Sequence, residues 1–194
     1  MTLIRVNPQS VREYGIQAQH LFESIATSLD RLVDDVVAVR YYGPNAVAFK
    51  TECGRLASDF GARLYADIGA MADAVRRSTS NIAASLGGQP ITIQLDNKPI
   101  VAPTPESVDF VDVDTAALEA VVPVVGTHFT SIRDALTTHF QRLQQTDWEG
   151  NAKLAAVDAV GGFTTSARQS CDSSQQALTT FIRSQIQSVI VADR

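Results

Sequence analysis

The chain has 194 residues, of which 45% are hydrophobic and 19% are charged, and its formal net charge is −5. This length and composition are typical of a globular protein that buries a core without metal or disulfide support. The acidic balance argues against a nucleic-acid partner, because no basic stripe is present to neutralise phosphates.

The first 86 residues predict a hairpin of two long helices. Asn7 is the expected N-cap, with Pro8 at the first helical position. A break at Gly43-Pro44 separates this helix from a second one over about 44–85. The apolar positions recur at steps of three and four, as in helices that pack lengthwise on each other. They are Val11, Tyr14, Ala18, Leu21, Ile25, Leu29, Leu32, Val36 and Val39, then Val47, Leu64, Ile68, Met71, Val75 and Ile82.

Residues 87–110 predict a linker. Gly87, Gly88 and four prolines exclude a helix there. Alternating residues in "ITIQL" and "KPIVA", on either side of Asp96-Asn97, indicate a short β-hairpin or an extended arm.

Residues 111–194 predict a second helical hairpin. Asp114 is the expected N-cap, and Gly150-Asn151 separates the third helix from a fourth over about 151–190. The apolar positions are Leu118, Val121, Val125, Phe129, Ile132, Leu136 and Leu143, then Leu154, Val157, Leu178, Ile182, Ile186 and Val189.

A single offset of 107 residues aligns the two hairpins without a gap, which indicates an internal duplication. It matches Val6 with Val113, Phe22 with Phe129, Leu29 with Leu136, Gly43 with Gly150 and Gly54 with Gly161. Neither hairpin can cover its apolar face alone. We therefore predict an all-α fold in which the two hairpins pack as one antiparallel four-helix bundle, with their tips at opposite ends. About 24 extended linker residues reach ~80 Å, enough to span a helix of ~50 Å.

Both breaks combine an aromatic residue with a glycine, as Tyr41-x-Gly43 and Trp148-x-Gly150. The glycine supplies the backbone angles of a tight reversal. The aromatic side chain is expected to lie across the hairpin end, where Trp148 would bury on the order of 200 Å².

The segments "DWEGNAKLAAV" and "RYYGPNAVAF", each in the middle of a helical hairpin, resemble the WXG (Esx-like) family. These small helical-hairpin proteins are associated with type VII (ESX) secretion in actinobacteria and related Gram-positive bacteria. Phe49, eight residues after Tyr41, stands where such proteins often carry an aromatic residue. The resemblance covers roughly 4–86 and 111–191.

The chain departs from the family pattern in three ways. Tyr41 replaces the first tryptophan, and two hairpins that family members usually bring together as a two-chain dimer are fused. The family's export signal, Tyr-x-x-x-Asp/Glu, is missing, since Tyr65 is followed four places on by Gly69.

The resemblance implies a non-catalytic interaction protein that binds other helical proteins as a substrate, partner or chaperone of a type VII system. The alternative is a cytosolic structural or assembly protein that forms a homo-oligomer. No signal-peptide pattern opens the chain, and no window approaches the ~20 apolar residues of a membrane span, because "LEAVVPVVG" is broken by Pro123. We expect a cytoplasmic protein, or one that is exported without a leader.

No catalytic, cofactor-binding or metal site is predicted. Cys53 and Cys171 lack metal or redox spacing and are expected to be reduced, unlinked and buried. His139 aligns with Leu32 and is interpreted as a hydrogen-bonded or half-exposed helix residue. His20 and His128 are isolated in sequence from any cluster of cysteines or acids.

The acidic residues Asp109, Asp112 and Asp114 lack the spacing and glycine of a calcium loop. They are interpreted as a solvated strand edge that leads into the helix cap at Asp114.

Overall fold

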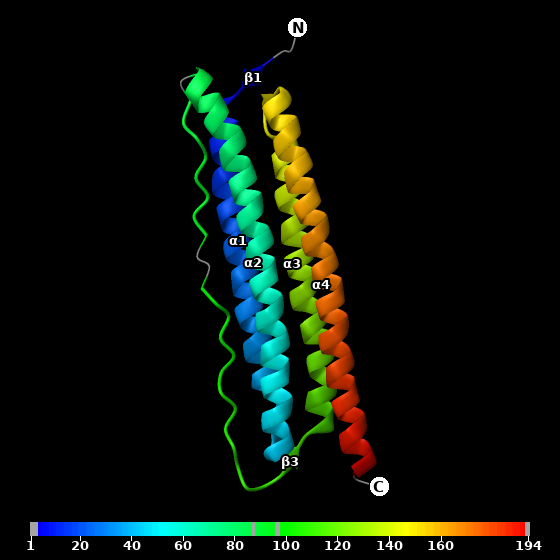
Figure 1. The fold of residues 1–194 in the computed structure, drawn as a ribbon. Coiled ribbons are helices and arrows are strands. Elements are labelled where there is room, and N and C mark those ends of the chain that lie inside the picture. Colours follow the sequence, from blue (N-terminus) through cyan, green and yellow to red (C-terminus); the bar gives the residue numbers. More distant parts are fainter. Residues whose placement is uncertain (1–3, 87, 96–97, 193–194) are drawn as a thin grey trace. The chain divides into compact units, whose positions relative to one another are not determined.

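A computed structural model describes residues 4–86, 88–95 and 98–192. It is 78% helical, and its four helices pack as the predicted all-α bundle (Figure 1). The helices are α1 (Pro8–Val37), α2 (Pro44–Leu86), α3 (Thr115–Gln145) and α4 (Asn151–Ala192). Four short strands accompany them: β1 (Arg5–Val6), β2 (Tyr41–Tyr42), β3 (Asp112–Val113) and β4 (Trp148–Glu149). We call α1 with α2 hairpin 1, and α3 with α4 hairpin 2.

Both predicted N-caps are confirmed. The Asn7 side-chain oxygen accepts hydrogen bonds from the backbone N–H groups of Gln9 and Ser10, at 3.1 and 3.3 Å. The Asp114 carboxylate accepts one from Ala117, at 3.0 Å. Asn7 and Asp114 are equivalent under the offset of 107, so the duplication extends to the start of each hairpin.

The chain divides into two compact units, and each contains a segment of every helix. Unit 1 comprises Met1–Ile25, Leu64–Asn97 and Arg133–Gln169. Unit 2 comprises Ala26–Arg63, Lys98–Ile132 and Ser170–Arg194. Each unit therefore contains the tip of one hairpin and the start of the other.

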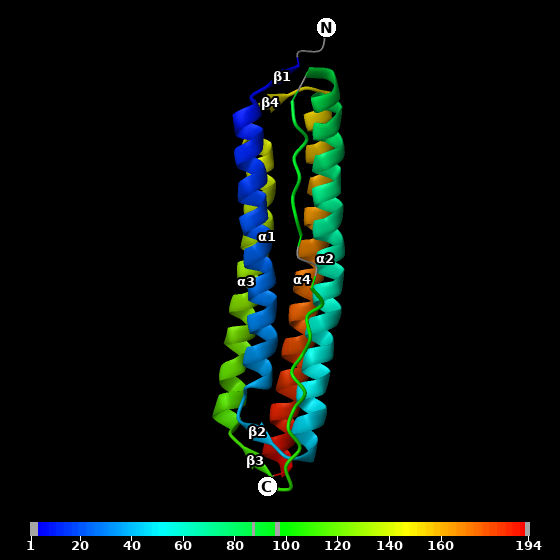
Figure 2. The same cartoon turned by 90° about the vertical axis from the view of Figure 1, so that its left-hand side faces the viewer.

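The strands pair within each unit and show how the hairpins run. In unit 1, β1 pairs antiparallel with β4, so that Val6 faces Trp148. In unit 2, β2 pairs antiparallel with β3, so that Tyr41 faces Val113 (Figure 2). Each tip thus meets the start of the other hairpin, which confirms the predicted antiparallel orientation.

Most of the predicted apolar positions are buried, including all seven in α3. The clear exception is Leu154, which is 68% exposed. The buried face of α4 instead passes through Ala156 and Val160, because the helical period turns Leu154 away from the core. Half-buried positions at the edges of the pattern are Leu21, Val47, Ile82, Val157 and Val189.

The linker contains no strand in residues 88–95 and 98–110, so the β-hairpin alternative has no support there. The predicted turn at Asp96-Asn97 lies outside the described residues. In unit 1, the backbone N–H of Ile91 donates to the Thr79 hydroxyl, at 3.1 Å. In unit 2, the Ser58 hydroxyl donates to the Ile100 carbonyl, at 2.8 Å. Both isoleucine side chains are buried, so the linker is an extended segment that packs on hairpin 1 at these positions.

Helix α3 differs from the sequence expectation in two ways. Pro123 lies inside a continuous helix rather than breaking it, and its ring is on the exposed side. By length and composition alone, α3 is also long and apolar enough to cross a membrane, with a mean hydropathy of 1.2 in its most apolar window. Only 28% of that window is buried. The expectation that no window approaches such a span was therefore wrong, since few charges interrupt this stretch.

Candidate functional site

The two hairpin tips share one backbone geometry. Gly43 and Gly150 have φ angles of +117° and +124°, and no other glycine in the described part of the chain has a positive φ. Two residues earlier, the N–H groups of Tyr41 and Trp148 donate to the carbonyls of Val39 and Thr146, both at 2.8 Å. The predicted role of the glycines in the reversal is confirmed.

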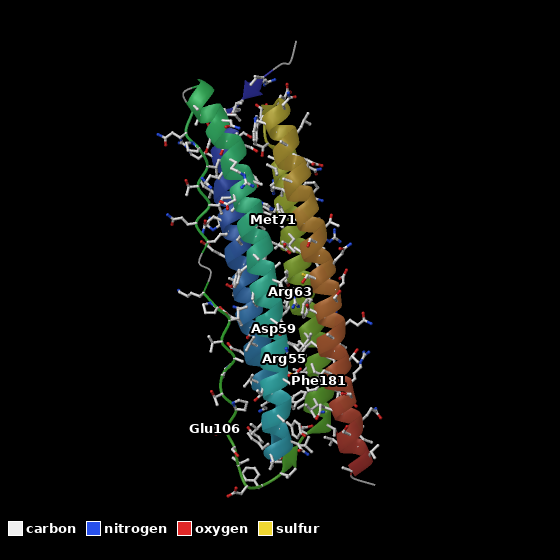
Figure 3. All side chains as sticks on the ribbon, viewed as in Figure 1. Arg55, Asp59, Arg63, Met71, Glu106 and Phe181 are labelled. Atoms are coloured by element: carbon white, nitrogen blue, oxygen red, sulfur yellow. The ribbon has the colours of Figure 1, made fainter. Side chains whose placement is uncertain are left out.

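The aromatic residues of the tips belong to the core. Trp148 is 2% exposed and Tyr41 is 5% exposed. In unit 2 the ring centroids of Tyr41 and Phe49 lie 5.6 Å apart. The Phe49 ring also stacks on that of Phe181, labelled in Figure 3, at a centroid distance of 5.7 Å. In the repeat, the small residue Ala156 takes the place of Phe49. The larger aromatic at position 148 thus accompanies a smaller residue eight positions later.

An ion pair joins the hairpins at each tip. Positions that are equivalent under the repeat carry opposite charges in the two ion pairs. In unit 2, the Arg40 guanidinium donates to the Asp112 carboxylate through Nε and Nη2, at 3.1 and 3.0 Å. These hydrogen bonds raise the pKa of Arg40 above its usual range. In unit 1, Arg5 lies 3.6 Å from Asp147. Under the offset of 107, Arg5 corresponds to Asp112 and Arg40 to Asp147.

Matching backbone hydrogen bonds accompany these ion pairs. The Asn7 N–H donates to the Asp147 carbonyl, at 2.9 Å, and the Asp114 N–H donates to the Arg40 carbonyl, at 3.1 Å. Asp112 lies in β3 and Asp114 caps α3, as the strand-edge interpretation predicts, whereas the ion pair of Asp112 with Arg40 was not predicted. Asp109 is exposed.

A cleft of about 840 Å³ opens beside the tip in unit 2. Its lining includes Tyr42, Val111 and Val189, and none of the described residues that line it carries a charge. Val111 is 73% exposed and the neighbouring Phe110 is 59% exposed. This tip therefore presents apolar surface to solvent, which is typical of a protein contact site.

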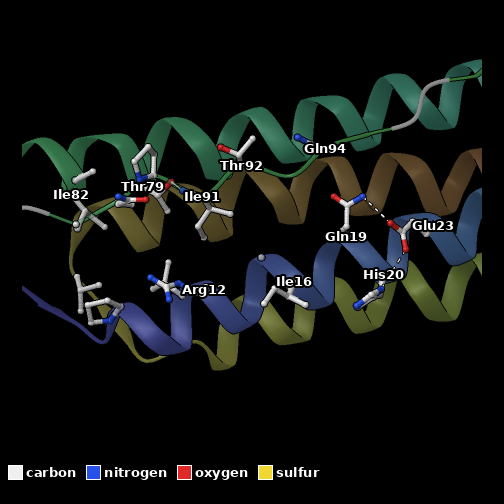
Figure 4. Close-up of a pocket in the computed structure, with 18 residues that line it drawn as sticks. Arg12, Ile16, Gln19, His20, Glu23, Thr79, Ile82, Ile91, Thr92 and Gln94 are labelled. Atoms are coloured by element: carbon white, nitrogen blue, oxygen red, sulfur yellow. Dashed lines mark hydrogen bonds and ion pairs between the residues drawn. The ribbon is translucent and has the colours of Figure 1, made fainter.

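A second cleft, also of about 840 Å³, lies in unit 1 between α1 and the linker (Figure 4). Ile16 and Ile91 line its apolar part. Its polar rim contains Gln19 and His20, which both contact Glu23, at 3.0 and 3.4 Å. The cleft therefore combines an apolar floor with a polar rim.

A buried polar pair links the hairpins inside unit 1. His139 is fully buried, and its Nε2 lies 2.8 Å from the Tyr14 hydroxyl. The ring centroids of Phe22 and His139 lie 4.7 Å apart, and Nδ1 has no hydrogen-bond partner among the residues that the structure describes. Burial lowers the pKa of His139 to about 4, so the imidazole is neutral at pH 7. The expectation of a hydrogen-bonded histidine is confirmed.

Sequence reasoning missed the partner of His128. Its Nε2 lies 2.7 Å from the Asp35 carboxylate, although the two residues are 93 positions apart. No local pattern could signal this contact, because it depends on how α3 packs against α1 in unit 2. No group of three or more His, Cys, Asp or Glu side chains able to hold a metal occurs in the described residues.

The fold and the tips define a bundle of two antiparallel helical hairpins, each closed by an aromatic residue and a positive-φ glycine. Comparisons with models of known protein families, with curated proteins and with solved structures found no match.

Proposed function

We propose that the chain is a non-catalytic interaction protein, built as a fused pair of WXG-like hairpins, that serves a type VII secretion system as substrate, partner or chaperone. The observation that carries this proposal is the reciprocal contact of the tips. Trp148 of hairpin 2 pairs with the start of hairpin 1, and Tyr41 of hairpin 1 pairs with the start of hairpin 2. A two-chain dimer of such hairpins would need this arrangement, and here one chain supplies both halves.

Exposed apolar surface supports an interaction role. Phe110 and Val111 project beside an uncharged cleft in unit 2, and a partner helix could cover both.

Expression in an actinobacterium that carries a type VII system tests the proposal. The chain, with a small epitope tag, would be followed in cells and culture medium of a wild-type strain and a strain without the type VII ATPase. A substrate appears in the medium only when the ATPase is present. A partner or chaperone stays in the cell and co-purifies with a named component of the system. A cytosolic marker controls for lysis.

A cytosolic assembly protein is the second candidate, favoured by the same exposed apolar residues if they meet those of another copy. Sedimentation of the purified chain separates the two. A concentration-dependent oligomer that Phe110→Ser and Val111→Ser dissociate, together with no link to the secretion system, would replace the first proposal.

A further inference from the structure

The two hairpins share one pattern, but their mutual contacts are not those of two identical hairpins. Hairpin 1 supplies a basic residue at both tips, Arg5 and Arg40, and hairpin 2 supplies an acidic residue at both, Asp112 and Asp147. If two copies of hairpin 1 packed in the same way, Arg5 would face Arg40. Two copies of hairpin 2 would place Asp112 against Asp147. Like charges oppose both of these pairings, and opposite charges favour the observed one.

A buried layer makes the same distinction independently. In unit 1, Tyr14 of hairpin 1 is hydrogen-bonded to His139 of hairpin 2. The equivalent positions in unit 2 are Val121 and Leu32, both apolar and buried.

Pairing of like hairpins would break this match in the core. Two copies of hairpin 1 would place the Tyr14 hydroxyl against Leu32. Two copies of hairpin 2 would place the His139 imidazole against Val121. Each arrangement buries a polar group without a partner, which is costly in a core.

We propose that the contact between the hairpins is specific for an unlike partner. Hairpin 1 accepts a hairpin that has acids at the positions of Asp112 and Asp147 and a histidine at the position of His139, and it rejects a second copy of itself. In this chain, hairpin 2 is that partner. The proposal does not depend on a role in secretion, because it concerns only the contact that is present in the fold.

Charge reversal in the full chain tests the tips. The variant Arg5→Asp/Arg40→Asp places acids on both sides of each tip, so its thermal unfolding midpoint should fall by several degrees, more at low than at high salt. Adding Asp112→Arg and Asp147→Arg restores opposite charges and the original net charge, and should recover most of the loss. Arg12→Asp/Arg183→Asp, at exposed arginines with no acid three or four residues away on α1 and α4, is the matched control and should leave the midpoint close to that of the original chain.

A double-mutant cycle tests the buried layer. Tyr14→Val and His139→Leu should each lower the midpoint, because each leaves the other polar group unpaired. The double variant copies Val121 and Leu32 and should lose less than the sum of the single variants. If a single variant does not fold, folding of the double variant shows the same coupling.

Two results would overturn the proposal. One is a charge-reversed chain that unfolds at the same midpoint as its Arg12/Arg183 control. The other is a pair of core losses that simply add. Either result shows that the corresponding layer does not distinguish unlike from like hairpins.

Discussion

Val6 pairs with Trp148 across a two-residue antiparallel ladder, and their repeat counterparts Val113 and Tyr41 pair in the same way. Each tip is therefore completed by backbone from the other hairpin. This exchange explains why the aromatic residues of the tips are buried, since a tip alone would leave one side of the ring uncovered.

Trp148→Ala should destabilise the protein by about 3 kcal/mol, because it removes the largest fully buried side chain and leaves a cavity. Trp148→Phe keeps most of the apolar volume and should cost clearly less. Chemical denaturation of both variants measures the difference. Unchanged stability in Trp148→Ala, with loss of a binding activity, would instead make the indole a recognition element.

Gly43→Ala should destabilise the first tip by about 1–2 kcal/mol, because alanine is strained at a φ of +117°. The added Cβ would also lie 3.3 Å from the Phe110 carbonyl oxygen. Gly162→Ala is the matched control in the interior of α4, where a Cβ meets nothing within 4 Å. It should be neutral or stabilise by up to about 1 kcal/mol. Equal thermal melts for the two variants would contradict this role of the φ angle.

The helices and their pairing could be predicted from sequence because they depend on regular periods and on a repeat. The steps of three and four placed residues such as Ile25 and Phe129 in the core, and the offset of 107 equated Gly43 with Gly150. Both signals are local or recur along the chain. The cap residues Asn7 and Asp114 were predictable for the same reason.

The contacts between the hairpins were not predictable in this way. Arg40 meets Asp112, and His128 meets Asp35, only after the hairpins pack, and nothing in the neighbouring sequence marks either pair. A hydrogen bond to His139 was expected, but its partner Tyr14 was not, because Tyr14 lies 125 positions away and fits an apolar helix pattern when considered alone.

The linker should loosen from hairpin 1 in the variant Gly54→Ala. A Cβ on Gly54 would overlap the Ala102 Cβ, so the linker backbone must move away. Gly69→Ala, on the same helix, meets nothing within 4 Å and serves as the control. Elastase, which cuts after small apolar residues, should cleave near Val101 faster in Gly54→Ala than in Gly69→Ala. Equal cleavage rates would show that Gly54 does not hold the linker.

Cys53 and Cys171 should react slowly with iodoacetamide in the folded protein. Both thiols are buried and neither is in a disulfide, and burial raises the pKa of Cys53 to about 12, so little Cys53 thiolate is present at pH 8. Intact mass after brief alkylation should show no addition, and the same treatment in denaturant should show two. A disulfide in freshly purified protein would contradict the predicted reduced state.

Acid should destabilise the protein through His139. The folded-state pKa is about 4 and the ordinary value is 6.5, so between these pH values the unfolded chain binds a proton that the folded chain does not. Stability from this residue is therefore complete above pH 6.5 and falls as the pH drops toward 4, by about 3 kcal/mol in all.

Carboxylates also titrate as the pH approaches 4, so the contribution of His139 must be isolated by comparison with a variant that lacks it. His139→Leu/Tyr14→Val keeps His20, His128 and every carboxylate but removes the buried imidazole. Urea midpoints at pH 7.0, 5.5 and 4.5 should fall more steeply for the original chain than for this variant. Parallel curves would mean that the imidazole becomes protonated without cost, which requires solvent or a counter-charge at Nδ1.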